Sequence, residues 1–219
     1  MTKDWKYIVY VGLLGALLAF VLLSKNKEHD WSLHFSHLSK DPYGTYALKE
    51  LLPDQLKNQK LIHSYKTIYE LKDSIQPQEN ILIISSQFSP DAEDAKVLLT
   101  LVENGATAFI SSNSFSGTFA DTLGLETGDS FFQGEESFNQ NDSAALYFVS
   151  PFMDTTQQYR FKKSNIYNYF RKIDSVSASV IAKNDFDQPV TVRIQKGKGS
   201  FILNCTPIVF TNIYLLADI

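Results

Sequence analysis

The sequence predicts a three-layer α/β protein, in which helices cover both faces of a mostly parallel sheet. Two short apolar runs, 81–84 and 106–110, lack polar alternation, as expected for strands buried on both faces. Between them we predict a helix, because four apolar residues follow the i, i+3, i+4, i+7 spacing of one helix face: Ala95, Leu98, Leu99 and Val102. A strand, a helix and a strand in this order indicate a βαβ crossover.

Residues typical of helix ends mark both limits of this central helix. We expect Ser89 to cap it, Pro90 to take its first position, and Asp91 to meet the positive end of its dipole. At the other end, Asn104 precedes Gly105, which can adopt the left-handed conformation that ends many helices.

Near the amino terminus, residues 7–23 predict a transmembrane helix. This uncharged run is flanked by lysines and lies at the lower end of the roughly 17 to 25 residues that a spanning helix needs. Trp5, Tyr7 and Tyr10 lie at one end, where aromatic rings favour the headgroup level. No small-x-small cleavage site follows the run, so an uncleaved anchor is favoured over a signal peptide.

The numbers of lysines on the two sides of this run are nearly equal, so the positive-inside rule favours neither orientation strongly. The orientation that we predict is based on the short length of the segment before the run. Residues 1–6 are expected in the cytoplasm, with the bulk of the chain outside the cell inner membrane. Residues 24–40 read as a tether to an α/β domain at 41–219. Within the tether, His34 and His37 with nearby Asp30 are too few for structural zinc, which usually has four ligands, so no metal site is predicted.

The α/β domain is expected to begin with alternating helices and strands. Asp41 and Pro42 would start a helix that ends at Pro53, with its apolar face formed by Ala47, Leu48, Leu51 and Leu52. A strand at 61–65 and a helix that ends at Pro77, with apolar residues Ile68, Leu71 and Ile75, would follow. Such alternation predicts a mostly parallel sheet with right-handed crossovers.

From residue 113 the sequence is rich in Ser, Asn, Gly, Asp and Phe. We assign 113–165 as a loop-rich insertion with one helix, 118–123, ended by Gly124. Long irregular loops are often functional. A partner-binding patch is therefore one hypothesis, if its phenylalanines prove exposed together, and a poorly ordered insertion is the other. The candidate partner-binding residues are Phe115, Phe119, Phe131 and Phe132.

The rest of the chain is rich in predicted strands. They span 144–149, 159–163, 176–182, 190–195 and 200–205. The glycines of Lys196-Gly197-Lys198-Gly199 predict a tight hairpin between the last two strands, and 201–205 is apolar enough to lie inside the main sheet. Thr211 and Asn212 mark the start of a further helix.

Few residues point to chemistry. Ser85 and Ser86 follow the central strand at the carboxyl edge, where open α/β sheets bind ligands, so they are the candidate ligand-binding residues. Cys205 closes an apolar strand and precedes Thr206-Pro207, which favours a buried, inert thiol over a nucleophile. No catalytic residue, cofactor or metal ligand is predicted, because phosphate-loop, nucleophile-elbow and dinucleotide motifs are absent.

The net charge of −4 and the lack of a basic stripe exclude nucleic acid as a predicted partner. The lipid bilayer is a predicted partner through residues 7–23.

Three groups of residues resemble the membrane-anchored family of domain of unknown function 4350. They are 41–48 (DPYGTYAL), the central unit that closes with 102–106 (VENGA), and the carboxyl-terminal motifs at 189–190, 197–199, 204–207 (NCTP) and 211–212. The resemblance covers about residues 25–219. It implies a fold similar to class I glutamine amidotransferase or flavodoxin-like domains, set between membrane helices. It also implies a gene neighbourhood with MoxR-type ATPases and von Willebrand-like membrane proteins, and a second membrane helix that would fall beyond Ile219. The family has no established activity, so no catalytic residue carries over.

We therefore predict a membrane-anchored, non-catalytic binding or scaffold domain in a complex with a MoxR-type ATPase or another membrane protein. One alternative is a degenerate or unrecognised hydrolase that uses Ser85, Ser86 or a carboxylate in the loop after the central strand. The other is a ligand sensor coupled to a transporter or ATPase. A pocket with a convergent nucleophile, base and acid would favour the enzyme.

Overall fold

The computed structural model describes residues 4–23, 29–57, 60–76, 79–129, 143–162 and 167–216. The chain forms two compact units, Met1–Asp30 and Trp31–Ile219. The first unit contains α1 (Asp4–Leu23). Within the described ranges, no helix is both long enough and apolar enough to cross a membrane.

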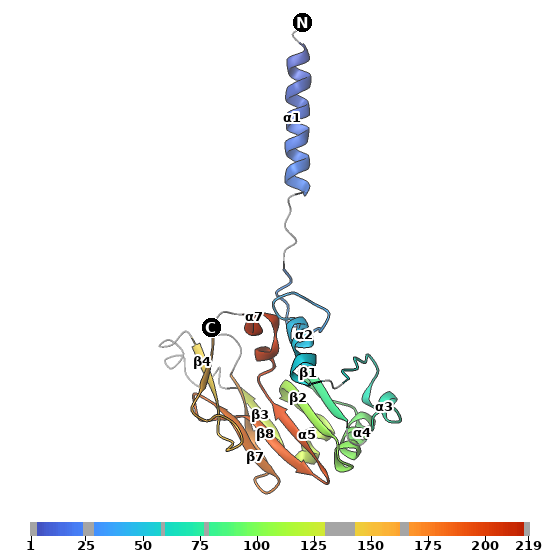
Figure 1. Ribbon diagram of the computed structural model, residues 1–219, viewed down its shortest axis with the longest axis vertical. Helices are drawn as coiled ribbons and strands as arrows, with labels where there is room; N and C mark the ends of the chain where they lie inside the picture. Colours follow the sequence, from blue (N-terminus) through green and yellow to red (C-terminus); the bar gives the residue numbers. More distant parts are fainter. Residues whose placement is uncertain are drawn as a thin grey trace. The chain divides into compact units, whose positions relative to one another are not determined.

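The second unit contains two sheets and several helices (Figure 1). The helices are α2 (Tyr46–Gln55), α3 (Ile68–Leu71), α4 (Ala92–Glu103), α5 (Gly117–Leu123), the 3₁₀ helix η1 (Pro207–Phe210) and α7 (Asn212–Leu215). The first strands are β1 (Asn80–Phe88), β2 (Thr107–Phe115), β3 (Glu126–Asp129), β4 (Ser143–Phe148) and β5 (Gln158–Lys162). The remaining strands are β6 (Asn168–Lys172), β7 (Ala178–Asn184), β8 (Pro189–Lys196) and β9 (Gly199–Asn204).

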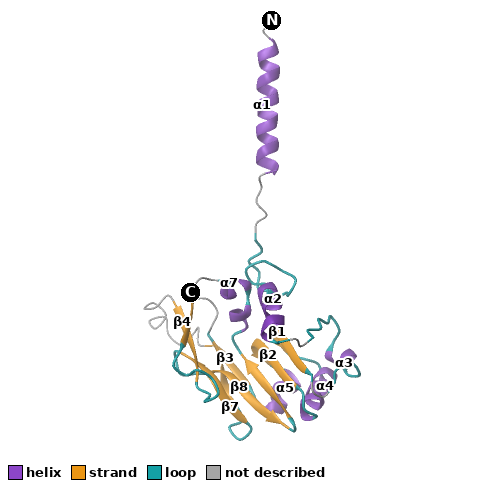
Figure 2. Cartoon of the chain, viewed as in Figure 1, coloured by secondary structure: helices purple, strands orange, loops and turns teal. Residues whose placement is uncertain are grey.

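The main sheet has seven strands in the order β1-β2-β9-β8-β7-β4-β5, drawn in orange in Figure 2. The predicted parallel pairing of 81–84 with 106–110 is confirmed, with Ile81 opposite Ala108 and Ile83 opposite Ile110. The prediction of a mostly parallel sheet is wrong. Only β1-β2 and β2-β9 pair in parallel among the described strands, and the other four pairings in the sheet are antiparallel.

The reason lies in the connections after β2. Parallel neighbours need a crossover of a dozen or more residues, whereas antiparallel neighbours need only a hairpin. The predicted hairpin at 196–199 joins β8 to β9, and Gly197 has a φ of 58°, in the left-handed region. Strand β9 therefore lies between β2 and β8, which confirms that 201–205 belongs to the main sheet.

Helices lie on both faces of the sheet around β2 and β9. Neighbouring residues of a strand point to opposite faces. On one face, the Phe119 ring of α5 contacts Phe201 of β9, with centroids 5.4 Å apart. On the other, the Phe109 ring of β2 contacts Phe210 of η1 at 5.6 Å. The apolar centre of the core includes Leu98, Val102, Ala108, Ile110, Val190, Val192, Phe201 and Leu203, all fully buried.

The central helix is confirmed as α4, but its cap differs from the prediction. The cap is Asp91, whose carboxylate accepts a hydrogen bond of 2.8 Å from the Asp94 amide, and Ser89 and Pro90 precede the helix. Gly105 has the predicted positive φ, 127°. The short helix ended by Gly124 is also confirmed, with Gly124 at a φ of 63°.

The amino-terminal part of the domain departs most from the prediction. Helix α2 begins at Tyr46 instead of Asp41, because residues 36–45 form a loop in which the Thr45 hydroxyl donates to the Phe35 carbonyl at 3.0 Å. Pro53 lies inside α2. The buried ring of Phe35 belongs to the second unit, whose first residue is Trp31.

The strand expected at 61–65 is absent, and this segment is irregular. Its side chains have little to pack against, since Ile62 is 68% exposed and Tyr65 77% exposed. The helix expected next shrinks to α3, and Pro77 lies outside the described residues. The sheet consequently starts at β1, and the alternating pattern is shorter than expected.

All five strands predicted for the second half are confirmed, as β4, β5, β7, β8 and β9. Two strands were missed, β3 and β6, which pair with each other in a separate two-stranded sheet. Both are short and contain charged residues, so neither shows a clear alternation of polar and apolar residues.

Candidate functional site

The predicted ligand-binding serines lie at the carboxyl end of β1, where they meet the end of β2. Ser85 pairs with Ser112 across the two parallel strands. Ser86 is exposed, and the half-buried Ser85 has a buried hydroxyl oxygen without a hydrogen-bond partner. The structure thus brings serines of two strands together at the edge predicted from the sequence.

A buried polar network centred on Asn204 lies at the same end of β2 and β9. Its side-chain oxygen accepts hydrogen bonds from the Ser111 hydroxyl at 2.6 Å and from the Thr206 amide at 2.9 Å. Its side-chain nitrogen donates to the hydroxyls of Thr191 and Thr206 at 2.9 Å and 3.0 Å. Asn204 is only 5% exposed, and Ser111 and Thr206 are fully buried.

This network joins three neighbouring strands. Ser111 is in β2, Asn204 ends β9, and Thr191 is in β8. The Asn204 side-chain oxygen accepts from Ser111 and Thr206, and its amide nitrogen donates twice, so the side chain is satisfied within the protein. These polar groups therefore fasten the strand ends, and they do not present a free donor set to a ligand.

Cys205 follows this network and is fully buried, as predicted. Its thiol donates to the carbonyls of Asn168 and Val190, at 3.1 Å and 3.3 Å. Burial raises the pKa of the Cys205 thiol well above its ordinary value, so the reactive thiolate is disfavoured.

A second amide, Asn212, joins the two ends of the domain. Its side-chain oxygen accepts from the Ala47 amide of α2 at 2.8 Å. Its side-chain nitrogen donates to the carbonyls of Ser39 and Asp41, at 2.9 Å and 2.7 Å. Residues 41–48 and 211–212, two of the motifs noted in the sequence, are therefore in direct contact.

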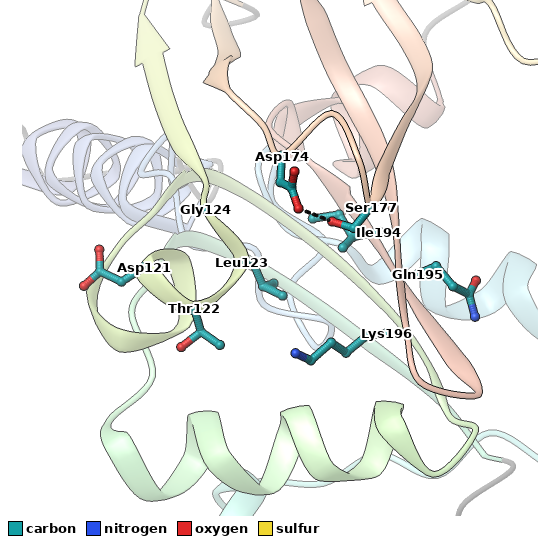
Figure 3. A pocket seen from close by; sticks show the side chains of 9 residues that line it. All are labelled: Asp121, Thr122, Leu123, Gly124, Asp174, Ser177, Ile194, Gln195 and Lys196. Atoms are coloured by element: carbon teal, nitrogen blue, oxygen red, sulfur yellow. Dashed lines mark hydrogen bonds between the residues drawn. The ribbon is translucent and has the colours of Figure 1, made fainter.

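A pocket of about 380 Å³ lies elsewhere, between α5, the turn before β7 and the end of β8 (Figure 3). Lys196 pairs with Gly199 at the start of β9, so the pocket is near the amino end of that strand, opposite the Ser85 edge. Its lining combines Asp121, Thr122, Leu123, Gly124, Asp174, Ser177, Ile194, Gln195 and Lys196.

Two of the pocket's charged side chains are already paired within the protein. The Asp174 carboxylate accepts from the Val176 amide and the Ser177 hydroxyl, and these bonds lower the pKa of Asp174. Lys196 lies 3.5 Å from the Glu103 carboxylate.

The predicted phenylalanine patch is wrong for the two residues that the structure describes. Phe115 and Phe119 are 5% and 0% exposed, and both belong to the core. Their rings pack against Phe170 and Phe88, with centroids 5.7 Å and 5.1 Å apart. Phe131 and Phe132 lie outside the described residues.

Sequence reasoning missed the roles of Asn204 and Asn212, although it singled out the motifs that contain them. An asparagine at the end of an apolar strand is a polar residue in a position typical of burial, and buried amides need partners. That signal was present at Asn204. The pocket had no sequence signal, since its lining comes from separate segments of the chain.

Comparisons with known proteins extend this picture. No curated protein matches the sequence significantly. Among solved structures, the mmIFT52 N-terminal domain is similar at a TM-score of 0.50 with 13% identity, over 78% of this chain and 82% of that one. The cytoplasmic protein STM1381 from Salmonella typhimurium LT2 matches at 0.47 with 14% identity, over 75% and 76% of the two chains.

Larger glycosidases also contain a similar portion. Gan42B, a β-galactosidase from G. stearothermophilus, matches at a TM-score of 0.45 with 16% identity over 79% of this chain. The present chain covers only 24% of that enzyme. For the exo-β-1,4-mannosidase Op5Man5 from Opitutaceae bacterium strain TAV5, the TM-score is 0.38 at 15% identity, over 59% of this chain and 20% of that one. At these identities the similarities concern the fold alone.

A family model settles the relationship that the motifs suggested. It matches residues 37–218, which include the Asn204 network, the Asn212 contacts and the pocket. The chain therefore belongs to the family described as domain of unknown function DUF4350.

Proposed function

We propose that this protein is a membrane-tethered binding or scaffold domain without catalytic activity of its own. The observation that carries the proposal is the use of polar groups at the carboxyl edge of the sheet. Asn204 forms hydrogen bonds with both Ser111 and Thr206, and these bonds hold strand ends together. In an α/β enzyme, groups at this edge would face the substrate.

The alternative of a hydrolase needs an activated nucleophile, with a base within hydrogen-bonding distance. Within the described residues, the hydroxyl of Ser85, one of the two serines predicted as nucleophiles, has no hydrogen-bond partner, so no base contacts it. Of the serines in β2, Ser111 donates to the Asn204 amide oxygen, and Ser112 donates to the Ser114 carbonyl. Neither acceptor can remove a proton at neutral pH. The Cys205 thiol is buried and donates to carbonyls in the same way. These arrangements favour a structural use of the edge over an active site.

The tether is proposed from the sequence of residues 7–23 alone. In the described residues, no helix meets the requirements for crossing a membrane. Helix α1 covers this run, and its large apolar side chains from Tyr7 to Phe20 are exposed, with Ile8 at 67% and Phe20 at 70%. Such side chains need an apolar environment, which a bilayer provides. We place the amino terminus in the cytoplasm and the domain outside the inner membrane.

The proposed partner is another membrane protein or a MoxR-type ATPase, and this part rests on the family resemblance alone. A protein without a catalytic site acts through what it binds, so partner capture is the direct test. The full chain would be expressed with a carboxyl-terminal tag, extracted from membranes in mild detergent, crosslinked and purified, and its partners identified by mass spectrometry.

Three results are expected. The protein stays in the membrane pellet after carbonate washing, it copurifies with a defined membrane protein or ATPase, and the purified chain does not hydrolyse ester, amide or phosphate substrates. Ester, amide or phosphate turnover that is lost in Ser85→Ala or Ser86→Ala would overturn the scaffold. Release of the full chain by carbonate would overturn the tether.

Orientation can be tested in the same cells with Ser32→Cys, which places a thiol at an exposed position after the anchor. The natural Cys205 is fully buried and gives a low background. A membrane-impermeant maleimide should label the variant in intact spheroplasts. Labelling that occurs only after lysis would contradict the proposed orientation.

A further inference from the structure

Residues 60–66, the irregular segment before α3, have few contacts with the rest of the domain. Most of their side chains are exposed, including Ile62 and Tyr65. Lys66 makes a local hydrogen bond to the Ser64 hydroxyl. Within the described residues, the ring contacts and side-chain hydrogen bonds that reach outside this segment all end on one residue, His37.

The contact with His37 has a well-defined geometry. The imidazole rings of His37 and His63 are stacked, with centroids 4.8 Å apart and planes only 4° from parallel. The Tyr65 hydroxyl lies 3.3 Å from Nε2 of His37, and its ring lies 5.6 Å from the imidazole. His37 itself lies in the loop before α2, next to the buried Phe35, so it is anchored to the domain.

Two potential cations and one tyrosine hydroxyl lie around His37. His63 stacks on it from the 60–66 segment, Tyr65 contacts it from the same segment, and Lys49 faces it from α2. Burial, followed by the effects of His63 and of Lys49, lowers the pKa of His37 below its ordinary value of 6.5. A second positive charge on the stacked pair would face the first across one ring separation.

We propose that His37 and His63 form a pH-sensitive latch, which holds residues 60–66 on the domain at neutral pH and releases them in mildly acidic conditions. In the latched state Nε2 of His37 can accept a hydrogen bond from the Tyr65 hydroxyl. Protonation removes that acceptor and sets like charges against each other.

The direction follows from linkage. Because the latched state lowers the pKa of His37, the released state binds protons more readily. The latch is therefore fully favoured above pH 6.5 and is weakened as the pH falls below 6.5 towards the lowered pKa. Release frees the side chains of His63 and Tyr65 from His37, in a segment that has strand-forming residues but no strand partner in the described structure.

The test uses the full chain in detergent micelles. Ring-proton NOEs between His37 and the rings of His63 and Tyr65 would be measured by NMR at pH 7.5 and pH 5. We expect these NOEs to weaken several-fold at the lower pH, while the NOEs between the core rings of Phe119 and Phe201 persist. NOEs of equal strength at both pH values would overturn the latch.

Substitutions separate the latch from a general effect of acid. His63→Phe keeps a ring against His37 but removes the second positive charge, so the pH dependence of the His37–Tyr65 NOE should become weaker, and only the part that comes from the burial of His37 and from Lys49 should remain. The matched control His29→Phe changes a histidine of the first unit and should leave the dependence intact. A variant His63→Phe with the wild-type dependence would overturn the proposal.

A second readout does not depend on these NOEs. The chain has only four histidines, so their ring protons can be assigned and titrated by NMR. The pKa of His37 should lie below 6.5 in the wild-type chain and rise towards it in His63→Phe. A His37 that titrates at its ordinary value in both proteins would show that the two rings are not coupled.

Discussion

The Asn204 side chain shows how one buried amide can determine the geometry of a sheet edge. It bonds to hydroxyls of β2 and β8 and to the backbone that follows β9. A leucine of similar size would fill the space but leave these hydroxyls unsatisfied in a buried environment. Each buried polar group without a partner costs about 1–3 kcal/mol, so the asparagine is strongly constrained by its neighbours.

Asn204→Ala is therefore expected to lower the free energy of unfolding by about 3 kcal/mol, since it leaves buried polar groups of Ser111, Thr191 and Thr206 without their partner. Urea denaturation of the full chain in detergent, followed by tryptophan fluorescence and circular dichroism, would measure it. The control Ser111→Ala removes one hydroxyl and one bond and should cost only about 1 kcal/mol. Equal effects of the two changes would contradict the central position of Asn204.

At this scale, the sequence predicts which residues are polar in apolar surroundings but not what they bond to. Ser85 was placed at the carboxyl edge correctly, because the strand before it was correct. The partner of Asn204 in β2 is 93 residues away in sequence, and the partner of Asn212 in α2 is 165 residues away. Such contacts depend on the strand order, which residue types alone do not specify.

Among the elements, α4 was predicted well because two independent patterns agree. Its apolar spacing matches the buried residues Ala95, Leu98 and Val102, and residues typical of helix ends occur at both limits. The cap itself was displaced by two residues, since Ser89, Pro90 and Asp91 are all compatible with a helix start. The structure selects Asp91, whose carboxylate is the acceptor for the Asp94 amide.

The cap assignment gives a prediction for two neighbouring substitutions. Asp91→Ala should lower the free energy of unfolding by about 1 kcal/mol, because it removes the side-chain acceptor at the amino end of α4. Ser89→Ala should have an effect of less than about 0.5 kcal/mol, as expected for an exposed site away from such features. Thermal and urea unfolding of both variants would compare them. A larger loss in Ser89→Ala would restore the cap inferred from the sequence.

Strands whose pairing partners are hairpin neighbours were predicted well, and isolated ones were not. Strands β8 and β9 are joined by a glycine hairpin, so local chemistry reports their pairing. The run 61–65 has strand-forming residues, yet strand propensity reflects packing on a pleated surface, and Ile62 and Tyr65 have none. Strands β3 and β6 form through each other, and neither has a strong pattern of its own.

For the whole molecule, the position of β9 beside β2 decides the architecture. The βαβ unit from β1 to β2 fixes a parallel start, and β9 then joins β2 in parallel after the chain has passed through hairpins. The result is a mixed α/β fold, in which the strand that neighbours β2 comes from the carboxyl-terminal end of the chain. Sequence patterns identified most of the elements, but this long-range placement of β9 was beyond them.

The hydrogen bonds of three aspartates lead to a prediction for the stability of the domain in acid. Three exposed carboxylates have pKa values below their ordinary value of 3.8 because of hydrogen bonds. In Asp154 the donors are the hydroxyl and amide of Thr156, in Asp174 the Val176 amide and the Ser177 hydroxyl, and in Asp187 the Lys183 ammonium and the Tyr147 hydroxyl. The folded state therefore releases these protons more readily than the unfolded state.

The sign follows directly. A depressed carboxylate pKa contributes stability that is complete above the unfolded value of 3.8 and is lost as the pH falls through the folded value. Stability of the domain should therefore fall below about pH 4, well separated from the window of the His37 latch, which lies below 6.5. Urea midpoints measured from pH 2 to pH 8 should show the lower step. The upper step should appear only in probes near residues 60–66.

Substitutions can assign the lower step to its residues. Asp174→Asn keeps an acceptor for the Ser177 hydroxyl but removes the titrating proton, so the slope of stability against pH should be shallower below pH 4. The same change at Asp73, another exposed carboxylate, serves as the control for the loss of one acidic group. If Asp174→Asn and Asp73→Asn behave alike, the hydrogen bonds of Asp174 do not set the acid stability, and the step must come from general charge repulsion across the domain.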